Sequence, residues 1–274
     1  MNITPLNNTK KFNQFLFNEI DMKLYKYKFL RSYIDNAKDG IEPVYDQSVL
    51  NISEKGWILI LHGSILLVYG ENWNENQVHE INSVFNLNKF TNYALSGDLE
   101  LIEKIIEIYK PYNTQVEKSR ILYKSKEIQI FKAENNNIRI GTFDESYELA
   151  LMLQEYYHEE YKGLNDKPIE EMQRRTLLMI HDKKIYILLD KDENLLSFCT
   201  IIDPDIGILF TKREHRNKGY GKIILSYCAQ ILKERNDTVY LMTDKNEISS
   251  NRVCLTVGFE PYYNYAMVNI NVGQ

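Results

Sequence analysis

The sequence feature that most constrains the fold is a glycine turn between an apolar run and a long helical pattern. The apolar run ends at Leu209-Phe210-Thr211, the glycines are Gly219 and Gly221, and helical spacing begins near residue 218 and continues to about 235. A strand, a tight turn and a helix in this order predict a mixed α/β chain. The two glycines allow the backbone to turn tightly and to approach a ligand without interference from a Cβ atom.

This segment is locally basic in an acidic chain. Residues 212–222 hold five Lys or Arg and one Glu, whereas the 274-residue chain has 33 basic and 38 acidic side chains. The unpaired N–H groups at the start of a helix favour anions, so the turn predicts a phosphate site. A Walker-type loop would need Gly at Arg216 and Ser or Thr at Ile223, and a dinucleotide fingerprint would need Gly at Ile224. The segment therefore matches neither the Walker-type loop nor the dinucleotide-binding motif.

In the C-terminal half, the sequence predicts a clear order of helices and strands. Apolar periodicity predicts a strand, two helices, three strands, a helix, a strand, a helix and a final strand. Their expected ranges are 138–142, 145–161, 168–180, 184–189, 195–202, 206–211, 218–235, 238–243, 248–257 and 265–271.

The motif Arg-x-x-Gly-x-Gly over residues 216–221 resembles the pyrophosphate-binding signature of the GNAT superfamily, the Gcn5-related N-acetyltransferases. Ser250-Asn251 followed by Gly258-Phe259 resembles the last helix of that superfamily and the turn that closes it, and the element order is also similar. The resemblance covers about residues 130–274. It implies a mixed, mostly antiparallel central sheet flanked by helices, and acetyl-CoA as co-substrate.

The resemblance also implies which residues contact acetyl-CoA. Backbone N–H groups from Asn217 to Lys222 would hold the pyrophosphate, and Leu209 to Thr211 would pair with the pantetheine arm as another strand does. The expected cofactor-binding set is Leu209, Phe210, Thr211, Arg216, Asn217, Lys218, Gly219, Tyr220, Gly221, Lys222 and Asn251. The alternative for any single lysine or arginine is an ordinary solvated charge.

Three residues are the candidates for catalysis. Where many relatives carry a Tyr that acts as general acid, this chain has Cys254, whose thiol could donate a proton but which in a short helix is more often a small buried hydrophobe. Tyr220 is a second candidate acid. Glu160 is the candidate base, and the neighbouring Glu159 and the turn residues Asp203 and Asp205 are alternatives to it. For each of them the alternative to a catalytic role is an exposed charge.

The implied reaction is direct attack of an amine on a thioester in a ternary complex. It needs a base for the amine, a donor for the oxyanion and a proton for the thiolate. We therefore expect an N-acetyltransferase that moves an acetyl group from acetyl-CoA to a primary amine of a small molecule or peptide. The absent Tyr leaves open a non-catalytic acyl-CoA-binding sensor or scaffold.

The N-terminal part, residues 1–127, is expected to be a second mixed α/β domain, and residues 128–274 the GNAT-like domain. Polar residues 134–137 mark the boundary. Within the first part we expect a helix over 8–34, a hairpin of 57–61 with 65–69, helices around 75–90 and 98–110 with Asp98 at the second start, and two strands within 119–132. Its hairpin and helices could be arranged as a degenerate copy of the same fold, which would shape the acceptor pocket or form a homodimer contact. This part has no Arg-x-x-Gly-x-Gly, so it is not expected to bind CoA.

Composition excludes several classes of protein. A net charge of −5 without a basic stripe argues against nucleic-acid binding. Apolar runs are too short for a membrane span, and the N-terminus shows no secretion signal. Cys199, Cys228 and Cys254 form no Cys-x-x-Cys, and the five His form no spaced pair. We therefore expect a reduced, cytoplasmic protein with no disulfide and no metal site.

Overall fold

A computed structural model describes residues 3–5, 21, 23–32, 47–51, 57–62, 65–70, 74–85, 92–110, 113–132 and 137–271. The chain divides into two compact units. Unit 1 comprises Met1–Leu122, Asp244–Asn246 and Tyr263–Gln274, and unit 2 comprises Tyr123–Thr243 and Glu247–Tyr262. Most of the predicted helix over 8–34 and most of the polar segment 134–137 lie outside the described residues. The domain division at residue 127 stays a prediction.

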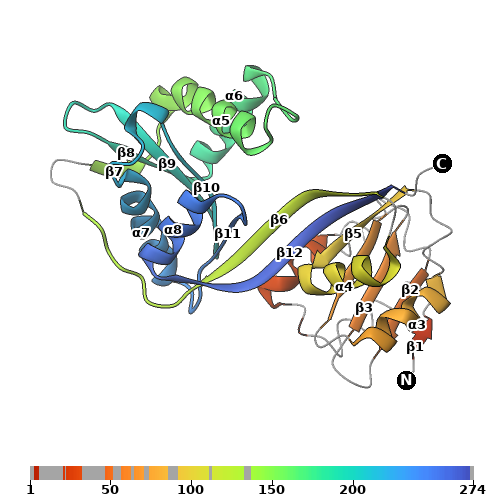
Figure 1. The fold of residues 1–274 in the computed structure, drawn as a ribbon. Coiled ribbons are helices and arrows are strands. Elements are labelled where there is room, and N and C mark those ends of the chain that lie inside the picture. The colour runs from red at the N-terminus through yellow and green to blue at the C-terminus, as the bar shows by residue number, and fades with distance from the viewer. Residues whose placement is uncertain are drawn as a thin grey trace. The chain divides into compact units, whose positions relative to one another are not determined.

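Unit 1 is built on a sheet in the order β1-β2-β3-β4-β5-β12-β6 (Figure 1). The strands are β1 (Ile3–Pro5), β2 (Gln47–Asn51), β3 (Trp57–His62), β4 (Ile65–Tyr69), β5 (Asn92–Asp98), β12 (Phe259–Asn271) and β6 (Asn113–Ser125). The predicted hairpin is confirmed, because β3 and β4 pair antiparallel with Ile58 opposite Tyr69. The 3₁₀ turn η1 (Tyr25–Tyr27) is followed by helical residues 28–32.

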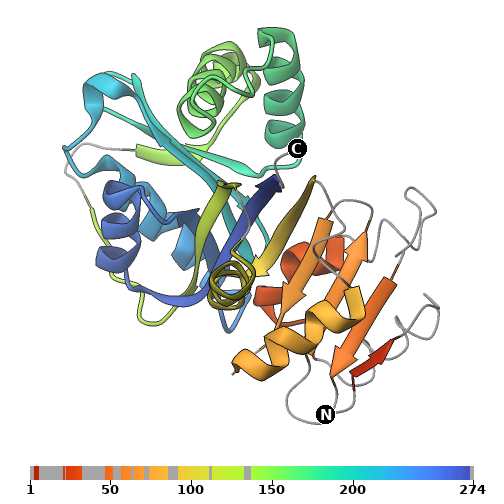
Figure 2. The same cartoon turned by 45° about the vertical axis from the view of Figure 1, so that its right-hand side comes forward.

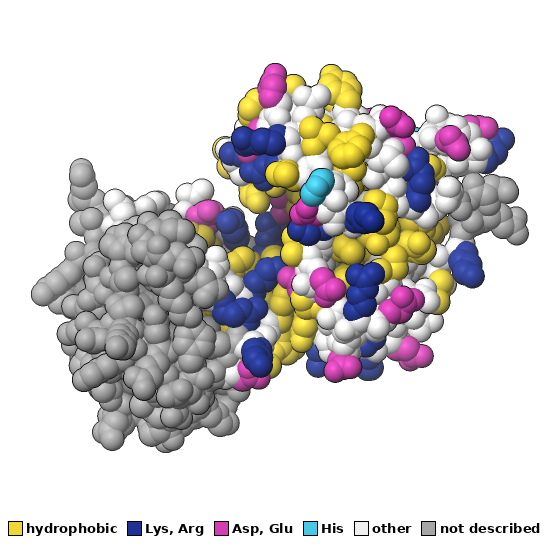
Figure 3. Space-filling view, turned by 180° about the vertical axis from the view of Figure 1, so that it is seen from behind, with side chains coloured by type: hydrophobic (Ala, Val, Ile, Leu, Met, Phe, Trp, Pro, Cys, Tyr) yellow, Lys and Arg dark blue, Asp and Glu magenta, His cyan; other side chains and the backbone are white. Residues whose placement is uncertain are grey.

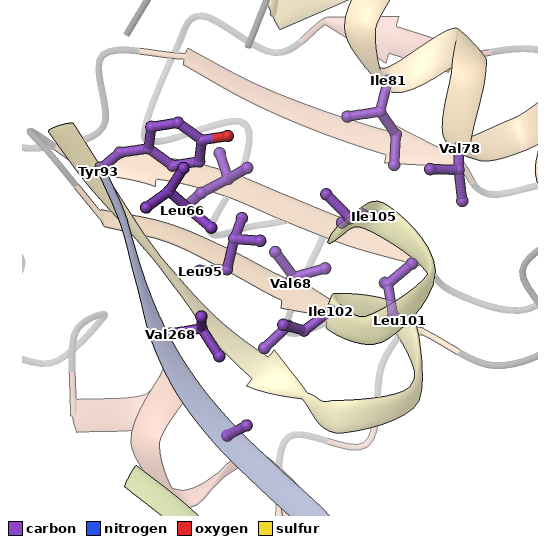
Figure 4. Packing of buried hydrophobic residues seen from close by; sticks show 12 residues of the cluster. Leu66, Val68, Val78, Ile81, Tyr93, Leu95, Leu101, Ile102, Ile105 and Val268 are labelled. Atoms are coloured by element: carbon purple, nitrogen blue, oxygen red, sulfur yellow. The ribbon is translucent and has the colours of Figure 1, made fainter. Parts of the chain in front are cut away.

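The two helices predicted in the N-terminal half are confirmed as α3 (Glu75–Phe85) and α4 (Leu99–Tyr109). Asp98 caps α4 as expected: the backbone N–H of Leu101 donates to its Oδ1 at 3.0 Å. The apolar faces of α3 and α4 pack on β4, β5 and β12 and form one core (Figure 4). That core consists of Leu66, Val68, Val78, Ile81, Tyr93, Leu95, Leu101, Ile102, Ile105, Ala266, Val268 and Ile270.

Unit 2 has the sheet order β6-β11-β10-β9-β8-β7. Its strands are β7 (Asn137–Ile140), β8 (Ile185–Leu189), β9 (Leu195–Ile202), β10 (Asp205–Thr211) and β11 (Tyr240–Asp244), with β6 at the edge. The pairs from β7 to β10 are antiparallel, and β10 and β11 are parallel. The predicted mixed, mostly antiparallel sheet is confirmed.

Helices cover both faces of this sheet (Figure 1 and Figure 2). On one face lie α5 (Ser146–Glu160), which follows the 3₁₀ turn η3 (Phe143–Glu145), and α6 (Ile169–His181). The other face carries α7 (Tyr220–Lys233) and α8 (Ile248–Val257). All of β8 and nearly all of β9 are buried, because their side chains meet helices on both faces.

The two halves of the chain repeat one order of elements. The series β2-β3-β4-α3-β5-α4-β6 corresponds to β8-β9-β10-α7-β11-α8-β12, with three antiparallel strands, a helix, a parallel strand, a helix and a last strand. The last strands are exchanged, since β12 pairs with β5 in unit 1 and β6 lies beside β11 in unit 2. This order supports the degenerate-copy hypothesis, which stays a prediction.

One predicted pair of strands is wrong. Residues 119–132 were expected to form two strands across a turn, but β6 runs as one strand to Ser125 and residues 127–132 form none. The backbone N–H of Lys126 donates to the Gly258 carbonyl, and that of Gln129 donates to the Val257 carbonyl, both at 2.9 Å. The segment after β6 therefore follows the end of α8 and does not fold back on β6.

The described surface mixes charge with apolar side chains. On the side of unit 2 seen in Figure 3, Lys and Arg alternate with Asp and Glu, and hydrophobic side chains lie between them. No helix in the described part of the chain combines the length and apolarity that a membrane crossing needs.

Candidate functional site

The site begins where β10 and β11 part. Both strands are fully described, and between them one residue pair is in parallel register, Asp205 with Tyr240. The other edge of β10 stays paired with β9 as far as Thr211, which lies opposite Ser197. The corresponding strands of unit 1, β4 and β5, pair over four residues. An extended ligand can therefore pair with β10 in unit 2, whereas the equivalent place in unit 1 is closed.

A left-handed turn leads from the end of β10 into α7. Asn217 and Gly219 have φ values of 62° and 88°, and α7 begins at Tyr220. Gly219, the N-cap of α7, has no side chain that could cap the helix, and in the described part of the chain the N–H of Ile223 donates to the Gly219 carbonyl, at 3.2 Å. The N–H groups of the preceding helical residues point out of the helix start, where an anion is favoured.

The two glycines of the motif, Gly219 and Gly221, differ in backbone conformation and in the space around them. Gly219 has a backbone conformation that L side chains rarely adopt. Gly221 is helical, and a Cβ atom there would meet only the Thr211 Oγ1 at 3.7 Å, an ordinary contact. The described structure therefore has room for a methyl group at Gly221, and the absence of a Cβ atom leaves space beside the end of β10.

The end of β10 is fixed on its β9 side. The Ser197 hydroxyl donates to the Phe210 carbonyl at 2.7 Å and lies 2.9 Å from the Thr211 hydroxyl. The Phe210 ring is buried and packs against Phe198 and Tyr156. Leu209 and Thr211 are partly exposed. This strand end is therefore held on its β9 side and partly accessible, which suits an edge that pairs with a ligand.

Carboxylates of α5 neutralise three cations of the basic segment. Glu148 pairs with Lys212, and Glu159 pairs with both Arg213 and Arg216. Burial alone would raise the pKa of Glu159, but hydrogen bonds from the two arginines outweigh it and lower that pKa below its ordinary value. Further along the segment, the Lys222 ammonium lies 5.0 Å from the centre of the Phe131 ring.

The predicted residues of α8 point into the protein. Cys254 is 3% exposed, and burial raises the pKa of its thiol to about 12. The Asn251 Oδ1 accepts hydrogen bonds from the Tyr123 hydroxyl, at 3.0 Å, and from the Thr243 hydroxyl. Burial also raises the pKa of Tyr123. A thiol with this pKa is protonated at neutral pH, and its burial keeps it from solvent.

Comparison with protein families matches residues 149–259 to the acetyltransferase (GNAT) family. This region is a GNAT acetyltransferase domain. The match begins in α5 and ends at Phe259, so it includes β10, the left-handed turn, α7 and α8. The resemblance inferred from Arg216, Gly219 and Gly221 is therefore confirmed.

Solved structures share the fold at low identity. A GCN5-related N-acetyltransferase from Sphaerobacter thermophilus matches with a TM-score of 0.57 and 12% identity, over 88% of this chain and 86% of its own. A GNAT-family acetyltransferase from Colwellia psychrerythraea matches with a TM-score of 0.54 and 12% identity, over 100% of both chains. A Drosophila protein matches with a TM-score of 0.57 and 12% identity, over 98% of both chains. A search among curated proteins returned no match for this sequence.

Within the GNAT domain, the two remaining catalytic candidates lie at helix ends. Tyr220 is the first residue of α7, partly exposed, with its ring edge-on to His215 at 6.4 Å. Glu160 is the last residue of α5 and is partly buried. The roles of Tyr220, Glu160 and Cys254, and the contacts expected for the acetyl-CoA set, stay predictions.

Sequence reasoning missed two residues that contact the predicted site, Tyr123 and Thr243, and it did not predict the partner of Glu159. Tyr123 and Thr243 hold Asn251, and Glu159 holds Arg216. Tyr123 is 128 residues from Asn251 in the chain, so no local spacing could connect them. Glu159 is an alternative candidate base in the sequence, but its pairing with Arg216 could not be predicted, because that pairing depends on how α5 packs beside β10.

Proposed function

We propose that the chain is an acyl-CoA-dependent N-acetyltransferase that transfers an acetyl group from acetyl-CoA to a primary amine of a small molecule or peptide. The observation that carries this proposal is the parting of β10 and β11 beside the uncapped start of α7. A pantetheine arm is a chain of amides, so it can pair with a strand edge, and a pyrophosphate fits a helix N-terminus.

In the proposed mechanism, Leu209 to Thr211 align the pantetheine arm and the N–H groups from Asn217 to Lys222 hold the pyrophosphate. A base removes a proton from the amine, whose nitrogen then bonds to the thioester carbon. A backbone N–H near Phe210 stabilises the oxyanion. The carbon–sulfur bond breaks, and the CoA thiolate leaves and takes up a proton. Orientation in one ternary complex supplies much of the rate enhancement.

One observation favours a second function, a non-catalytic acyl-CoA-binding sensor or scaffold. The position that carries a Tyr in many relatives is Cys254, and burial raises the pKa of that thiol to about 12. A thiol that stays buried and protonated supplies no accessible acid to a departing thiolate. The sensor would bind acetyl-CoA through the same strand edge and glycine turn, so turnover separates the two functions.

The first test is thermal unfolding with and without acetyl-CoA, with Gly221→Glu as the site variant. Its matched control is Gln230→Glu, which adds the same charge at an exposed position of α7. A ligand at 100 times its Kd stabilises by about 2.7 kcal/mol, and each kcal/mol moves the midpoint by roughly 2–4 °C in chains of 150–250 residues. In this longer chain the wild type and the control should therefore shift by about 5 °C, and Gly221→Glu should not.

Release of free CoA thiol with a panel of small primary amines and peptides then decides between the two functions. A shift with thiol release supports the acetyltransferase, and a shift without release from any amine supports the sensor. The absence of a shift in folded wild-type protein would refute both.

A further inference from the structure

Besides the pair of Glu148 with Lys212, one carboxylate of α5, that of Glu159, binds two arginines of the basic segment. The Arg213 Nε donates to the Glu159 Oε1 at 2.7 Å, and the Arg216 Nη2 donates to both oxygens of Glu159, at 3.0 and 2.8 Å. Glu159 and Arg216 are partly buried, with side-chain exposures of 29% and 37%, whereas Arg213 is more exposed at 62%. The pair of Glu159 with Arg216 is therefore the better shielded of the two contacts.

Arg216, which binds Glu159 of α5, also contacts the end of β10. Its Nε donates to the Thr211 carbonyl at 3.0 Å, and its guanidinium carbon lies 5.1 Å from the centre of the Phe210 ring. A planar guanidinium can meet a carboxylate, a carbonyl and a ring face together, which an ammonium cannot. Arg216 thus contacts α5 with one nitrogen and the last residues of β10 with another.

Nothing within α5 favours a carboxylate at the position of Glu159. It lies in the last turn of the helix, where the dipole disfavours a carboxylate. Among the described residues, Arg213 and Arg216 are the groups that offset this unfavourable position and the burial of the carboxylate. The carboxylate therefore stabilises the basic segment, through Arg213 and Arg216, and does not stabilise α5.

We propose that Glu159 is a positioning residue for acyl-CoA, which acts through Arg216 to fix the end of β10 and the turn of residues 212–219. The turn is then preorganised, so that its N–H groups face the pyrophosphate before the ligand arrives. This inference rests on the proposed function, because it concerns the same acyl-CoA site. It assigns the Arg216 side chain a structural contact inside the protein and leaves phosphate binding to the backbone.

Binding measurements on four variants test the inference. Glu159→Gln removes the charge, Arg216→Lys keeps the charge but loses the planar fork, and the double variant combines them. Glu170→Gln, an exposed carboxylate on α6, is the matched control. The probes are CoA and inorganic pyrophosphate, measured by titration calorimetry at a temperature well below every unfolding midpoint.

Each single variant should raise the Kd for both probes about tenfold, and the double variant should be no weaker than the weaker single, because the two residues act as one unit. The control should stay within twofold of the wild type. A general loss of stability would not produce this non-additive pattern. A Kd for Glu159→Gln within twofold of the wild type would overturn the inference, and so would additive effects in the double variant.

Amide hydrogen exchange without ligand gives an answer that does not depend on binding. In Glu159→Gln and Arg216→Lys, amides of residues 211–219 should exchange at least fivefold faster, while those of α6 stay unchanged. If the wild type binds neither CoA nor acetyl-CoA, the proposed function fails and exchange alone decides. Faster exchange in this turn then supports the positioning role, and unchanged exchange overturns it. If Glu159→Gln does not fold, Arg216→Lys carries both measurements.

Discussion

Substitution of Gly221 by Ala should move stability and ligand affinity in opposite directions. Gly221 is the second residue of α7, and a Cβ atom there would meet only the Thr211 Oγ1, at 3.7 Å. No close contact with the described residues opposes the new methyl group. In the proposed complex, however, the methyl would occupy space that the pyrophosphate needs beside the end of β10.

The structure sets the expected size of both effects. Ala is favoured over Gly in a helix interior by up to about 1 kcal/mol, and near the first turn we expect about half of this. The unfolding midpoint of the free protein should therefore rise by about 1–2 °C. A methyl pressed against a close-packed phosphate should weaken acetyl-CoA binding at least tenfold, which is about 1.4 kcal/mol.

Differential scanning fluorimetry of the free protein and titration calorimetry with acetyl-CoA measure the two effects separately. Ala at the neighbouring Gly219, whose φ is 88°, serves as contrast, because it should lower both stability and affinity. Unchanged affinity in Gly221→Ala would refute the placement of the pyrophosphate against this residue. A lower midpoint in the free protein would refute the claim that α7 tolerates the methyl.

Three further predictions concern Cys254, Glu145 and Gly258. Cys254→Ala should keep the initial rate of thiol release within threefold of the wild type, because a thiol with a pKa of about 12 is buried away from the reaction; a tenfold loss would make it catalytic. Two hydrogen bonds from Arg139, at 2.6 and 3.2 Å, lower the pKa of Glu145 from 4.5 to about 2. A carboxyl group with a lowered pKa contributes stability that is present above pH 4.5 and lost as the pH falls towards 2. In Glu145→Gln, the free energy of unfolding measured in urea should therefore depend less on pH between 4.5 and 2. The same pH dependence in the variant and the wild type would contradict this. Gly258→Ala should destabilise by more than about 2 kcal/mol in urea, because φ is +102° and the Cβ would lie 1.8 Å from the Glu127 carbonyl oxygen; a smaller loss would show that this backbone moves easily.

The sequence was most informative where local pattern decides the structure. The element order of unit 2 follows from apolar periodicity, and the uninterrupted apolar run of β8 matches a strand that is buried on both faces. The glycine turn was also visible, because Gly219 and Gly221 stand at a fixed spacing before a long amphipathic pattern. The cap of α4 by Asp98 is a contact between near neighbours and was predicted for the same reason.

Contacts between distant residues account for what could not be predicted. Residues 127–132 have strand-like composition, but their backbone follows the end of α8 through the Val257 and Gly258 carbonyls. The pairing of β12 with β5 joins segments from opposite halves of the chain, and no turn between them sets its register. The contacts of Tyr123 and Thr243 with Asn251, and of Glu159 with Arg216, also depend on tertiary packing and not on sequence spacing.

The exchanged last strands have a consequence for how the protein is made. The core of unit 1 includes Ala266, Val268 and Ile270, which lie on β12 and pair with β5. On a ribosome that adds about 5–20 residues per second, the N-terminal segments must wait for almost the whole chain before this core can close. Meanwhile the edge of β5 is uncovered and can pair with another nascent chain. Vectorial synthesis therefore leaves unit 1, although its sequence comes first, as the last part of the molecule to complete its sheet.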